Sequence, residues 1–210
     1  MGDVKERPTL RDERAGVTRR RIAEAARTLF RTRGYGATTL RAVAEEAGVA
    51  VQTVYAVYGS KAGILHELRD TVLRQPAAEA LYEDAMREPK VERKLELFAS
   101  SIRRRWEFGH DVVAIHRDAG ATDPSVRVEV ERVLGMRRNG IARLARSLET
   151  ELTPGIDVAY ATAVLDALTL PEVYAELTDS QEWSAEQFEA WLARCLKNQL
   201  LGIRPPAVRT

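Results

Sequence analysis

The chain of 210 residues predicts an all-α fold. Over most of its length, apolar side chains recur every three or four positions, the spacing that places them on one face of a helix. No segment shows the sustained apolar–polar alternation, bounded by turn dipeptides, that is typical of strands. Glycine and proline separate the helical patterns, so that about nine or ten helices are expected.

The composition is that of a globular protein, with 45% apolar and 30% charged residues. No run of about 18 apolar residues is present, and the N-terminus has no apolar signal-peptide core, so the sequence indicates a cytoplasmic protein with no membrane span. The single cysteine, Cys195, excludes an internal disulfide framework. The three histidines are widely scattered and show no metal-ligand spacing, so no metal or other cofactor is expected.

Charge is unevenly distributed along the chain. Residues 1–72 hold 13 Lys and Arg against 9 Asp and Glu, whereas residues 73–210 hold 19 against 22. This asymmetry fits a basic nucleic-acid-binding part attached to an acidic body, and it equally fits an ordinary solvated surface.

The N-terminal part predicts three helices after a flexible arm at residues 1–14. The first helix is expected from Val17 to Arg33, with Thr18 as its N-cap. The stretch from Thr38 to Lys61 then predicts a helix over Leu40–Ala47 with Thr38 or Thr39 as N-cap, a break at Gly48, and a short helix over Val49–Val57. Two short helices separated by a glycine form a helix-turn-helix, which places its second helix in the DNA major groove.

The remainder predicts a helical second domain. Ser60 is expected to cap a fourth helix, and Asp123-Pro124 is expected to open a later one. Ser184 and Gln187 form a capping-box pattern before the last helix. Pro171 is expected to bend or break a helix between residues 156 and 177. The other expected helices lie between residues 76 and 89, from residue 91 through 109, and from residue 124 to 148.

Residues 22–65 resemble the DNA-binding domain of the TetR family of bacterial transcriptional regulators. The ordered motifs are A-x-x-L-F, R-G-Y, T-T, A-G-V, a tyrosine in the second helix of the motif, and S-K, and together they cover about a fifth of the chain. The resemblance implies an arm at residues 1–14, a DNA-binding domain at 15–60, and a helical effector-binding and dimerisation domain at 61–210. It also implies a homodimer on double-stranded DNA.

Seven residues are predicted to contact DNA. Glutamine is the usual partner of adenine, so Gln52 is expected to read a base edge, and Val51 or Ala56 can meet a thymine methyl group. The resemblance implies phosphate contacts for Tyr55 and Lys61. The full predicted set is Thr39, Arg41, Val51, Gln52, Thr53, Tyr55 and Lys61.

Alternative readings exist for several of these positions. Tyr55 and Tyr58 both fit an apolar core, and Lys61 fits an ordinary solvated surface. Ala50 stands where the family commonly has a capping serine or threonine, and the helix after it carries no charge. Phosphate affinity must therefore come from flanking residues.

Two further sets of residues follow from the resemblance to the family. Residues expected to line an effector pocket between the middle helices, most of which equally suit a core, are Tyr82, Met86, Phe98, Ile102, Trp106, His110, Val133, Met136, Arg137, Leu165 and Tyr174. Residues expected in the dimer interface, which also suit packing within one chain, are Ala159, Ala163, Ala167, Phe188, Trp191, Leu192 and Leu196.

Arg137 interrupts an otherwise apolar helical stripe, and a buried charge needs a partner. The sequence leaves three possibilities open. Arg137 pairs with Asp166, one of the two binds a polar group of a ligand, or the arginine extends to solvent.

The function that these features predict is ligand-responsive transcriptional regulation. The expected form is a repressor released from a palindromic operator by an unidentified small apolar effector. Alternatives are a helix-turn-helix regulator without a small-molecule inducer, and an activator. No catalytic triad, phosphate loop, metal cluster or paired-carboxylate motif indicates an enzyme.

Overall fold

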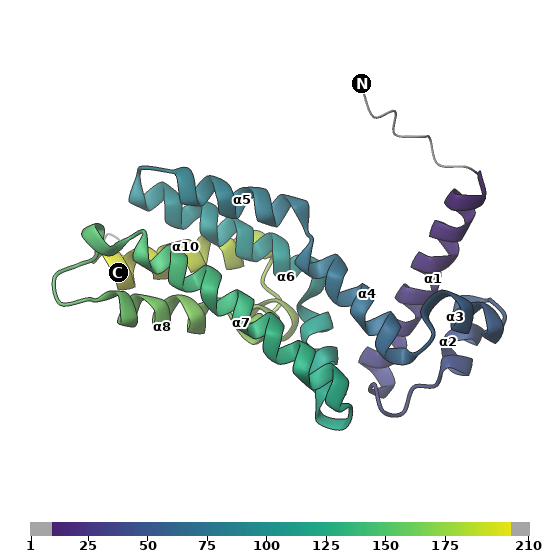
Figure 1. The fold of residues 1–210 in the computed structure, drawn as a ribbon. Helices are drawn as coiled ribbons and strands as arrows, with labels where there is room; N and C mark the ends of the chain where they lie inside the picture. The colour runs from purple at the N-terminus through teal and green to yellow at the C-terminus, as the bar shows by residue number, and fades with distance from the viewer. Residues whose placement is uncertain (1–9, 203–210) are drawn as a thin grey trace, which may run out of the picture.

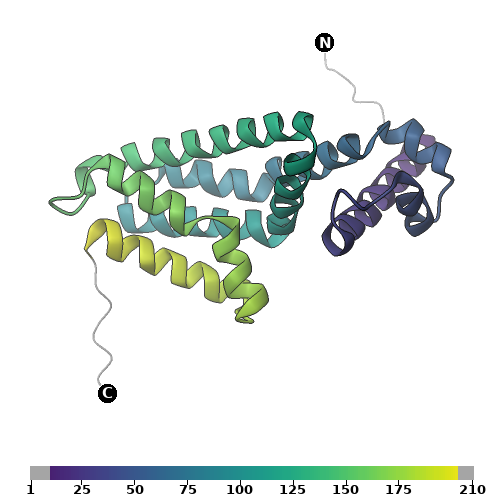
Figure 2. The ribbon, with the colours of Figure 1, turned by 90° about the horizontal axis from the view of Figure 1, so that it is seen from below.

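The computed structural model describes residues 10–202, with side chains from residue 13, and this part of the chain consists of ten α-helices and two short helical turns. The all-α prediction is confirmed (Figures 1 and 2). The helices are α1 (Leu10–Arg33), α2 (Leu40–Ala47), α3 (Val51–Tyr58), α4 (Lys61–Leu73), α5 (Pro76–Arg87), α6 (Val91–Thr122), α7 (Pro124–Arg146), α8 (Val158–Leu168), α9 (Pro171–Ala175) and α10 (Ala185–Leu201). A 3-10 turn at Glu149–Glu151 follows α7, and a π-helical turn at Glu176–Ser180 follows α9.

The predicted N-caps are confirmed at Thr39, Ser60 and Ser184. The Thr39 side chain accepts a hydrogen bond from the Ala42 amide, and Asp123 does the same for Ser125 at the start of α7. Ser184 and Gln187 form the predicted capping box. Each such cap satisfies a backbone N–H group that has no partner inside its helix.

One expectation about helix ends was wrong. α1 begins at Leu10, so residues 10–14 belong to a helix rather than to the arm, and Thr18 lies inside it. Residues 1–9 of the predicted arm lie outside the described residues. The break expected at Pro171 is confirmed, because α8 ends at Leu168 and Pro171 opens the separate helix α9. Proline lacks a backbone N–H and is therefore favoured at the first position of a helix.

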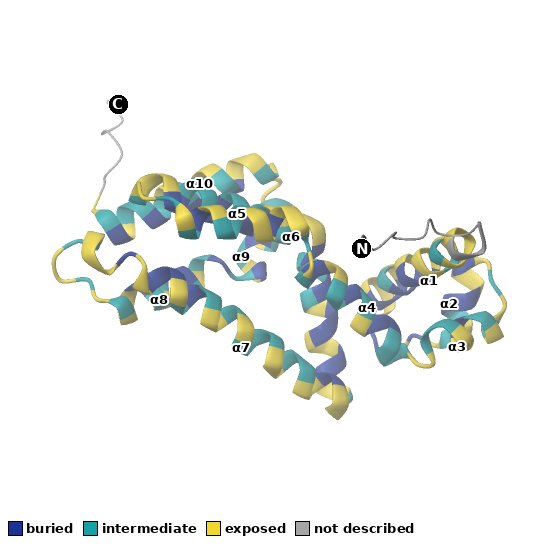
Figure 3. Cartoon of the chain, turned by 45° about the horizontal axis from the view of Figure 1, so that its top comes forward, coloured by how far each residue is buried: buried dark blue, intermediate teal, exposed yellow. Residues whose placement is uncertain are grey.

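The buried apolar side chains form two separate cores, which we call the head core and the body core (Figure 3). The head core contains residues of α1 to α4 together with Val112, Ile115 and Ala119 of α6 and Val126 of α7. The body core contains residues of α5 to α10, including the first half of α6. The predicted domain boundary at residue 60 follows the motif, whereas the head core extends through α4 and also includes the second half of α6.

The change from one core to the other occurs where α4 crosses α6. Gly109 interrupts the helical geometry of α6, with φ −160° and ψ 30°. A Cβ atom at this position would lie 2.2 Å from Cγ2 of Val72 in α4, so only glycine allows this close approach. The buried apolar residues of α6 that precede Gly109 therefore belong to the body core, and those that follow it belong to the head core.

Candidate nucleic-acid interface and effector domain

The recognition helix α3 is held by one apolar face and exposes the other. Val54 is completely buried in the head core, and Val57 packs against that core. Gln52 and Ala56 are exposed, and Tyr55 is 56% exposed, so its side chain does not belong to the core. The exposed residues form a polar and small surface that can approach the bases of a major groove.

Val51 lies in a different position from the one expected. It was predicted to face outward and meet a thymine methyl group, but it is half-buried and packs against the head core. It is the first residue of α3. Ala50 provides no side-chain cap for this helix, as its sequence implies.

Lys61 lies at the start of α4 and is engaged within the head. Its ammonium group donates a hydrogen bond to the Tyr35 carbonyl oxygen at 2.7 Å and lies 4.5 Å from the centre of the Tyr35 ring. The Lys61 side chain thereby fixes the turn between α1 and α2. An ammonium group has three N–H donors, so a phosphate contact through another of them stays a prediction.

Thr39 and Arg41 lie at the start of α2 and are both exposed. The Thr39 oxygen caps the helix by accepting a hydrogen bond, and its hydroxyl proton is free to be donated to a phosphate. Arg41 forms an ion pair with Glu45 at 3.1 Å on the surface, where such pairs are weak and easily exchanged.

Tyr58 joins α3 to α1 rather than filling the centre of the core. The side chain is half-buried, its hydroxyl donates a hydrogen bond to the Arg19 carbonyl oxygen at 2.9 Å, and the Arg19 guanidinium lies 4.9 Å from the ring centre. Burial raises the pKa of Tyr58 to about 12. The phenol therefore stays protonated and remains a hydrogen-bond donor at physiological pH.

Ion pairs attach the head to the second half of α6. Arg27 of α1 donates to both carboxylate oxygens of Asp111, at 2.7 and 2.5 Å. The Tyr35 amide donates to Asp118 at 2.9 Å. Burial opposes ionisation of Asp111, but the hydrogen bond and charge of Arg27 hold its pKa below the usual value.

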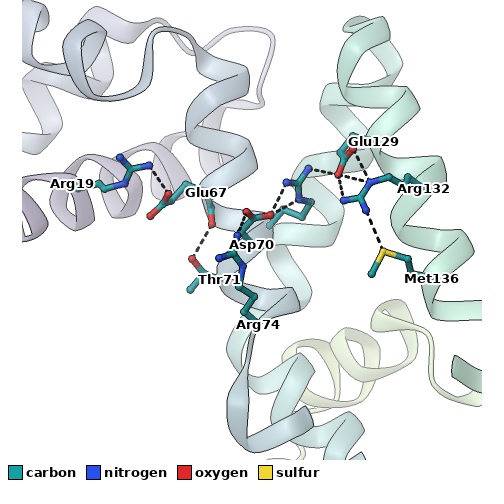
Figure 4. A network of polar contacts seen from close by, with 9 residues as sticks. Arg19, Glu67, Asp70, Thr71, Arg74, Glu129, Arg132 and Met136 are labelled. Atoms are coloured by element: carbon teal, nitrogen blue, oxygen red, sulfur yellow. Dashed lines mark hydrogen bonds and ion pairs between the residues drawn. The ribbon is translucent and has the colours of Figure 1, made fainter. Parts of the chain in front are cut away.

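A second group of ion pairs links α1, α4 and α7 (Figure 4). Arg19 pairs with Glu67 at 2.7 Å. Arg69 of α4 pairs with Asp70 of its own helix and with Glu129 of α7. Arg19, the α4 residues and Glu129 lie far apart in the sequence and share no motif, so the sequence alone did not indicate these pairs.

An open cleft of 460 Å³ lies beside this group, where α4 meets α5 and α6. Its walls come from distant segments of the chain, and none of them is a predicted effector residue. The lining residues are Glu67, Asp70, Thr71, Arg74, Gln75, Pro76 and Phe108.

Most predicted effector residues are gathered in or against the body core. Five of them are buried there, namely Phe98, Ile102, Trp106, Leu165 and Tyr174. Tyr82 and Met86 are half-buried against this core, and His110 packs on Tyr174 with ring centres 5.2 Å apart. On α7, Val133 is half-buried and Met136 is 52% exposed. Their contact with an effector stays a prediction.

Arg137 pairs with Asp166, which is one of the three possibilities that the sequence left open. The same guanidinium donates to the Asp166 carbonyl oxygen and to Oγ1 of Thr169, both at 2.9 Å. The Trp106 indole donates to the Thr169 carbonyl oxygen at 3.0 Å. This cluster connects α7, α6 and the end of α8.

Three predicted dimer residues instead belong to the interior of the chain. Phe188, Leu192 and Leu196 of α10 are completely buried in the body core, so they are not available to a partner subunit. A helical stripe shows that one face is buried, but it does not show which neighbour covers that face. Trp191 is half-buried and packs on Phe188 with ring centres 5.9 Å apart.

The small residues of α8 that were predicted in the dimer interface are exposed, in contrast to the buried residues of α10. Ala159, Ala163 and Ala167 are spaced four residues apart and are all exposed, next to Tyr160, which is 48% exposed.

No helix in the described part of the chain combines the length and apolar character that a membrane span requires. Within the same part, no group of three or more His, Cys, Asp or Glu side chains is placed to hold a metal ion.

Comparison with known proteins assigns the head to a family. Residues 22–68 match the family of bacterial regulatory proteins, tetR family. The search of proteins with curated functions found no match.

Several solved structures share the fold of the whole chain. The fatty acid degradation regulator FadR from Bacillus halodurans has a TM-score of 0.67 at 16% identity, covering 95% of this chain and 99% of its own. The transcriptional regulator FadR from Bacillus subtilis, in complex with stearoyl-CoA, has a TM-score of 0.66 at 20% identity, covering 88% and 99%. NalD, the secondary repressor of the MexAB-OprM multidrug efflux pump in Pseudomonas aeruginosa, has a TM-score of 0.67 at 23% identity, covering 90% and 98%.

The matched residues span α1 to α4, the part of the chain that presents the exposed face of α3. The similar structures extend the same architecture over the helices of the body. The head is therefore a DNA-binding domain of the tetR family of bacterial regulatory proteins, and the whole chain has the fold of these solved structures.

Proposed function

We propose that this regulator is a ligand-responsive repressor that leaves a palindromic operator when a small apolar effector binds in the body. The observation that carries this proposal is the division of α6 between the two cores. An effector that displaces the first half of α6 acts on the helix whose second half is part of the head. A ligand can shift the DNA-binding equilibrium only by preferring one arrangement of the two parts.

The predicted effector residues support an apolar ligand. Phe98, Ile102 and Leu165 are aliphatic or aromatic side chains that lie together in the body core. Two similar structures point in the same direction, since one is a FadR in complex with stearoyl-CoA and another is a repressor of a multidrug efflux pump.

The DNA contacts proposed for the head follow the exposed face of α3 and its flanks. Gln52 reads a base, with Thr53 beside it, and Tyr55 contacts a phosphate. Thr39, Arg41 and Lys61 supply further phosphate contacts, and Val51 contributes through its exposed part. Because α3 itself carries no charge, the flanking cations determine the salt dependence of binding.

A homodimer is proposed to form through α8. The exposed alanines at positions 159, 163 and 167 allow close approach of a helix from a second subunit, and Tyr160 adds apolar area beside them. Two heads would then meet half-sites one or more helical turns apart, at about 34–36 Å per turn.

The proposal is tested by a mobility shift of the purified protein on the DNA upstream of its own gene, over a series of salt concentrations. We expect a site-specific, salt-sensitive complex with two chains per site. Tyr55→Ala and Lys61→Ala should weaken it, whereas Arg87→Ala, an exposed arginine of the body, should not.

A library of apolar compounds is then screened for release of this DNA. Release by any of them supports a ligand-responsive repressor. If the complex forms but no compound releases it, a regulator without a small-molecule inducer is favoured. If the protein is folded and dimeric but binds no site there, its operator lies elsewhere or DNA binding requires a co-ligand.

A further inference from the structure

Arg105 occupies a position in α6 that would ordinarily be apolar. It follows Phe98 by seven residues and Ile102 by three, so the three side chains share one face of the helix. Phe98 and Ile102 are buried in the body core, and Arg105 is half-buried. The face that α6 turns toward its own domain therefore carries a guanidinium group.

The other arginines of α6 have carboxylate partners, but Arg105 has none. Arg93 pairs with Glu96 at 2.9 Å, and Arg103 pairs with Glu107 at 2.9 Å. Arg104 also reaches Glu107, at 3.7 Å, and Arg117 pairs with Glu172. Among the described side chains, residues 13–202, no carboxylate lies within 4.0 Å of Arg105 and no group accepts a hydrogen bond from it.

Burial lowers the pKa of Arg105, and only the more distant charge of Glu79 in α5 opposes this effect. A guanidinium remains protonated at physiological pH despite such a shift. It is thus a partly desolvated cation without a partner, a state that is unfavourable until an anion or a hydrogen-bond acceptor arrives.

The level of Arg105 along the body follows from the antiparallel packing of α6 and α7. Lys94 Nζ lies 3.3 Å from Ser147 Oγ at one end, and Gly120 lies beside Arg127 at the other. Counting inward from these contacts at about 1.5 Å per residue, Arg105 is level with about residue 138 of α7, less than one helical turn from Met136. Met136 is 52% exposed and is not part of the body core. The nearby cation Arg137 already has Asp166 as its partner.

We infer that Arg105 binds an anionic group of the effector, so that the effector is an apolar molecule carrying a carboxylate or a phosphate. Its apolar part lies along Ile102 and Met136, and its charge meets the guanidinium. Charge-assisted hydrogen bonds from arginine to carboxylate or phosphate are frequently bidentate, which also orients the ligand. This inference rests on the proposed function and names the chemical class of its effector.

The test compares molecules with the same twelve-carbon chain and different head groups. Binding of dodecanoate, dodecanol and dodecanoyl-CoA to the full-length protein is measured below their micelle concentrations by calorimetry. Release of operator DNA is measured in parallel. We expect dodecanoate or dodecanoyl-CoA to bind at least about tenfold more tightly than dodecanol, which corresponds to about 1.4 kcal/mol. The ligand whose affinity Arg105→Gln lowers identifies the anion as a carboxylate or a phosphate.

Arg105→Gln should abolish this preference for the anion while dodecanol binds as before. Arg104→Gln, which changes the neighbouring exposed arginine, should leave the preference intact. Glu79→Gln removes the one carboxylate that acts on Arg105 and should strengthen binding of the anion. Thermal unfolding of each variant confirms that it is folded.

Equal binding of dodecanol and the two anions, or a preference that survives Arg105→Gln, overturns the inference. If dodecanol nevertheless releases DNA, the proposed apolar effector stands and only its charge is wrong. If none of the three binds while the protein still binds its operator, the inference is also overturned. A failure of the protein to bind any operator counts against the proposed function itself.

Discussion

The two halves of α6 differ in what they stabilise. Residues 95–106 pack among the helices of the body, whereas residues 112–119 complete the core of the head. The second half is also attached to α1 by the Arg27–Asp111 ion pair. The difference teaches that the DNA-binding head is not built from the motif alone. A shift of the first half of α6 must be absorbed near Gly109 or passed on to the head.

Alanine at a buried position in each half of α6 tests this division most strongly. Phe98→Ala should lower the free energy of unfolding by about 3–5 kcal/mol, and Ile115→Ala by about 2–5 kcal/mol, because each leaves a cavity in a packed core. Urea unfolding measures the loss, and hydrogen exchange locates it. We expect Phe98→Ala to loosen α5 and α10, and Ile115→Ala to loosen α1 and α4. Identical exchange patterns in the two variants would show that the cores do not act as separate units.

The crossing of α4 over α6 predicts a smaller effect. Gly109→Ala places a methyl group 2.2 Å from Val72 Cγ2 and should reduce stability by about 1–3 kcal/mol. Adding Val72→Ala should recover part of this loss by removing the clashing atoms. Gly135→Ala on α7 is the matched control, because no atom lies within 4 Å of its added Cβ. The control should be stabilising by about 0.5–1 kcal/mol, as expected for alanine inside a helix. A neutral Gly109→Ala would mean that the crossing can readily separate.

The pH dependence of stability tests the head side of the comparison. His116 lies in the second half of α6, and its Nδ1–H donates to the Val112 carbonyl oxygen at 2.9 Å. Among the described residues, its buried Nε2 has no hydrogen-bond partner. Burial lowers the pKa of His116, and the charges of Arg69 and His66 act in the same direction, while the Val112 hydrogen bond and Glu129 oppose it.

The unfolded chain therefore binds a proton near pH 6.5, whereas the folded chain binds it only at lower pH. The contribution of neutral His116 to stability is complete above about pH 6.5 and is lost as the pH falls below that value, by at most about 1.4 kcal/mol per pH unit. When the pH is lowered from 7.5 to 6.5 and 5.5, the melting temperature of His116→Leu should fall less steeply than that of the wild type. The exposed His66, changed to Gln, is the control. An unchanged slope in His116→Leu would assign the acid sensitivity to other groups.

The smallest effect on stability is expected at the surface of the head. Arg41 is exposed and pairs only with Glu45, so Arg41→Ala should leave the melting temperature unchanged. If Arg41 contacts a phosphate, the slope of log K against log salt for operator binding should decrease in magnitude by about one unit. Arg87→Ala in the body should change neither quantity. An unaltered salt slope in Arg41→Ala would remove this residue from the DNA-binding set.

Local signals in the sequence predicted the helices of the head closely. Thr39, Gly48 and Ser60 mark helix ends through their own hydrogen bonds or backbone angles, and they do so independently of distant residues. The start of α1 was missed because no capping signal stops the helix between residues 10 and 17. The three buried residues of α10 were misassigned because the stripe that they form suits a partner subunit and the chain's own core equally well.

By itself, the sequence determined the helical class, several helix ends and the exposed face of the recognition helix, because caps, glycines and apolar periodicity act within a few residues. The sequence also indicated that Arg137 needs a partner. Only the tertiary structure decided that this partner is Asp166, that α6 is divided between two cores at Gly109, and that Arg105 has no carboxylate among the described residues. Each of these facts depends on which helix packs against which, and helix packing is a property of the whole chain that the order of residues in one helix does not specify.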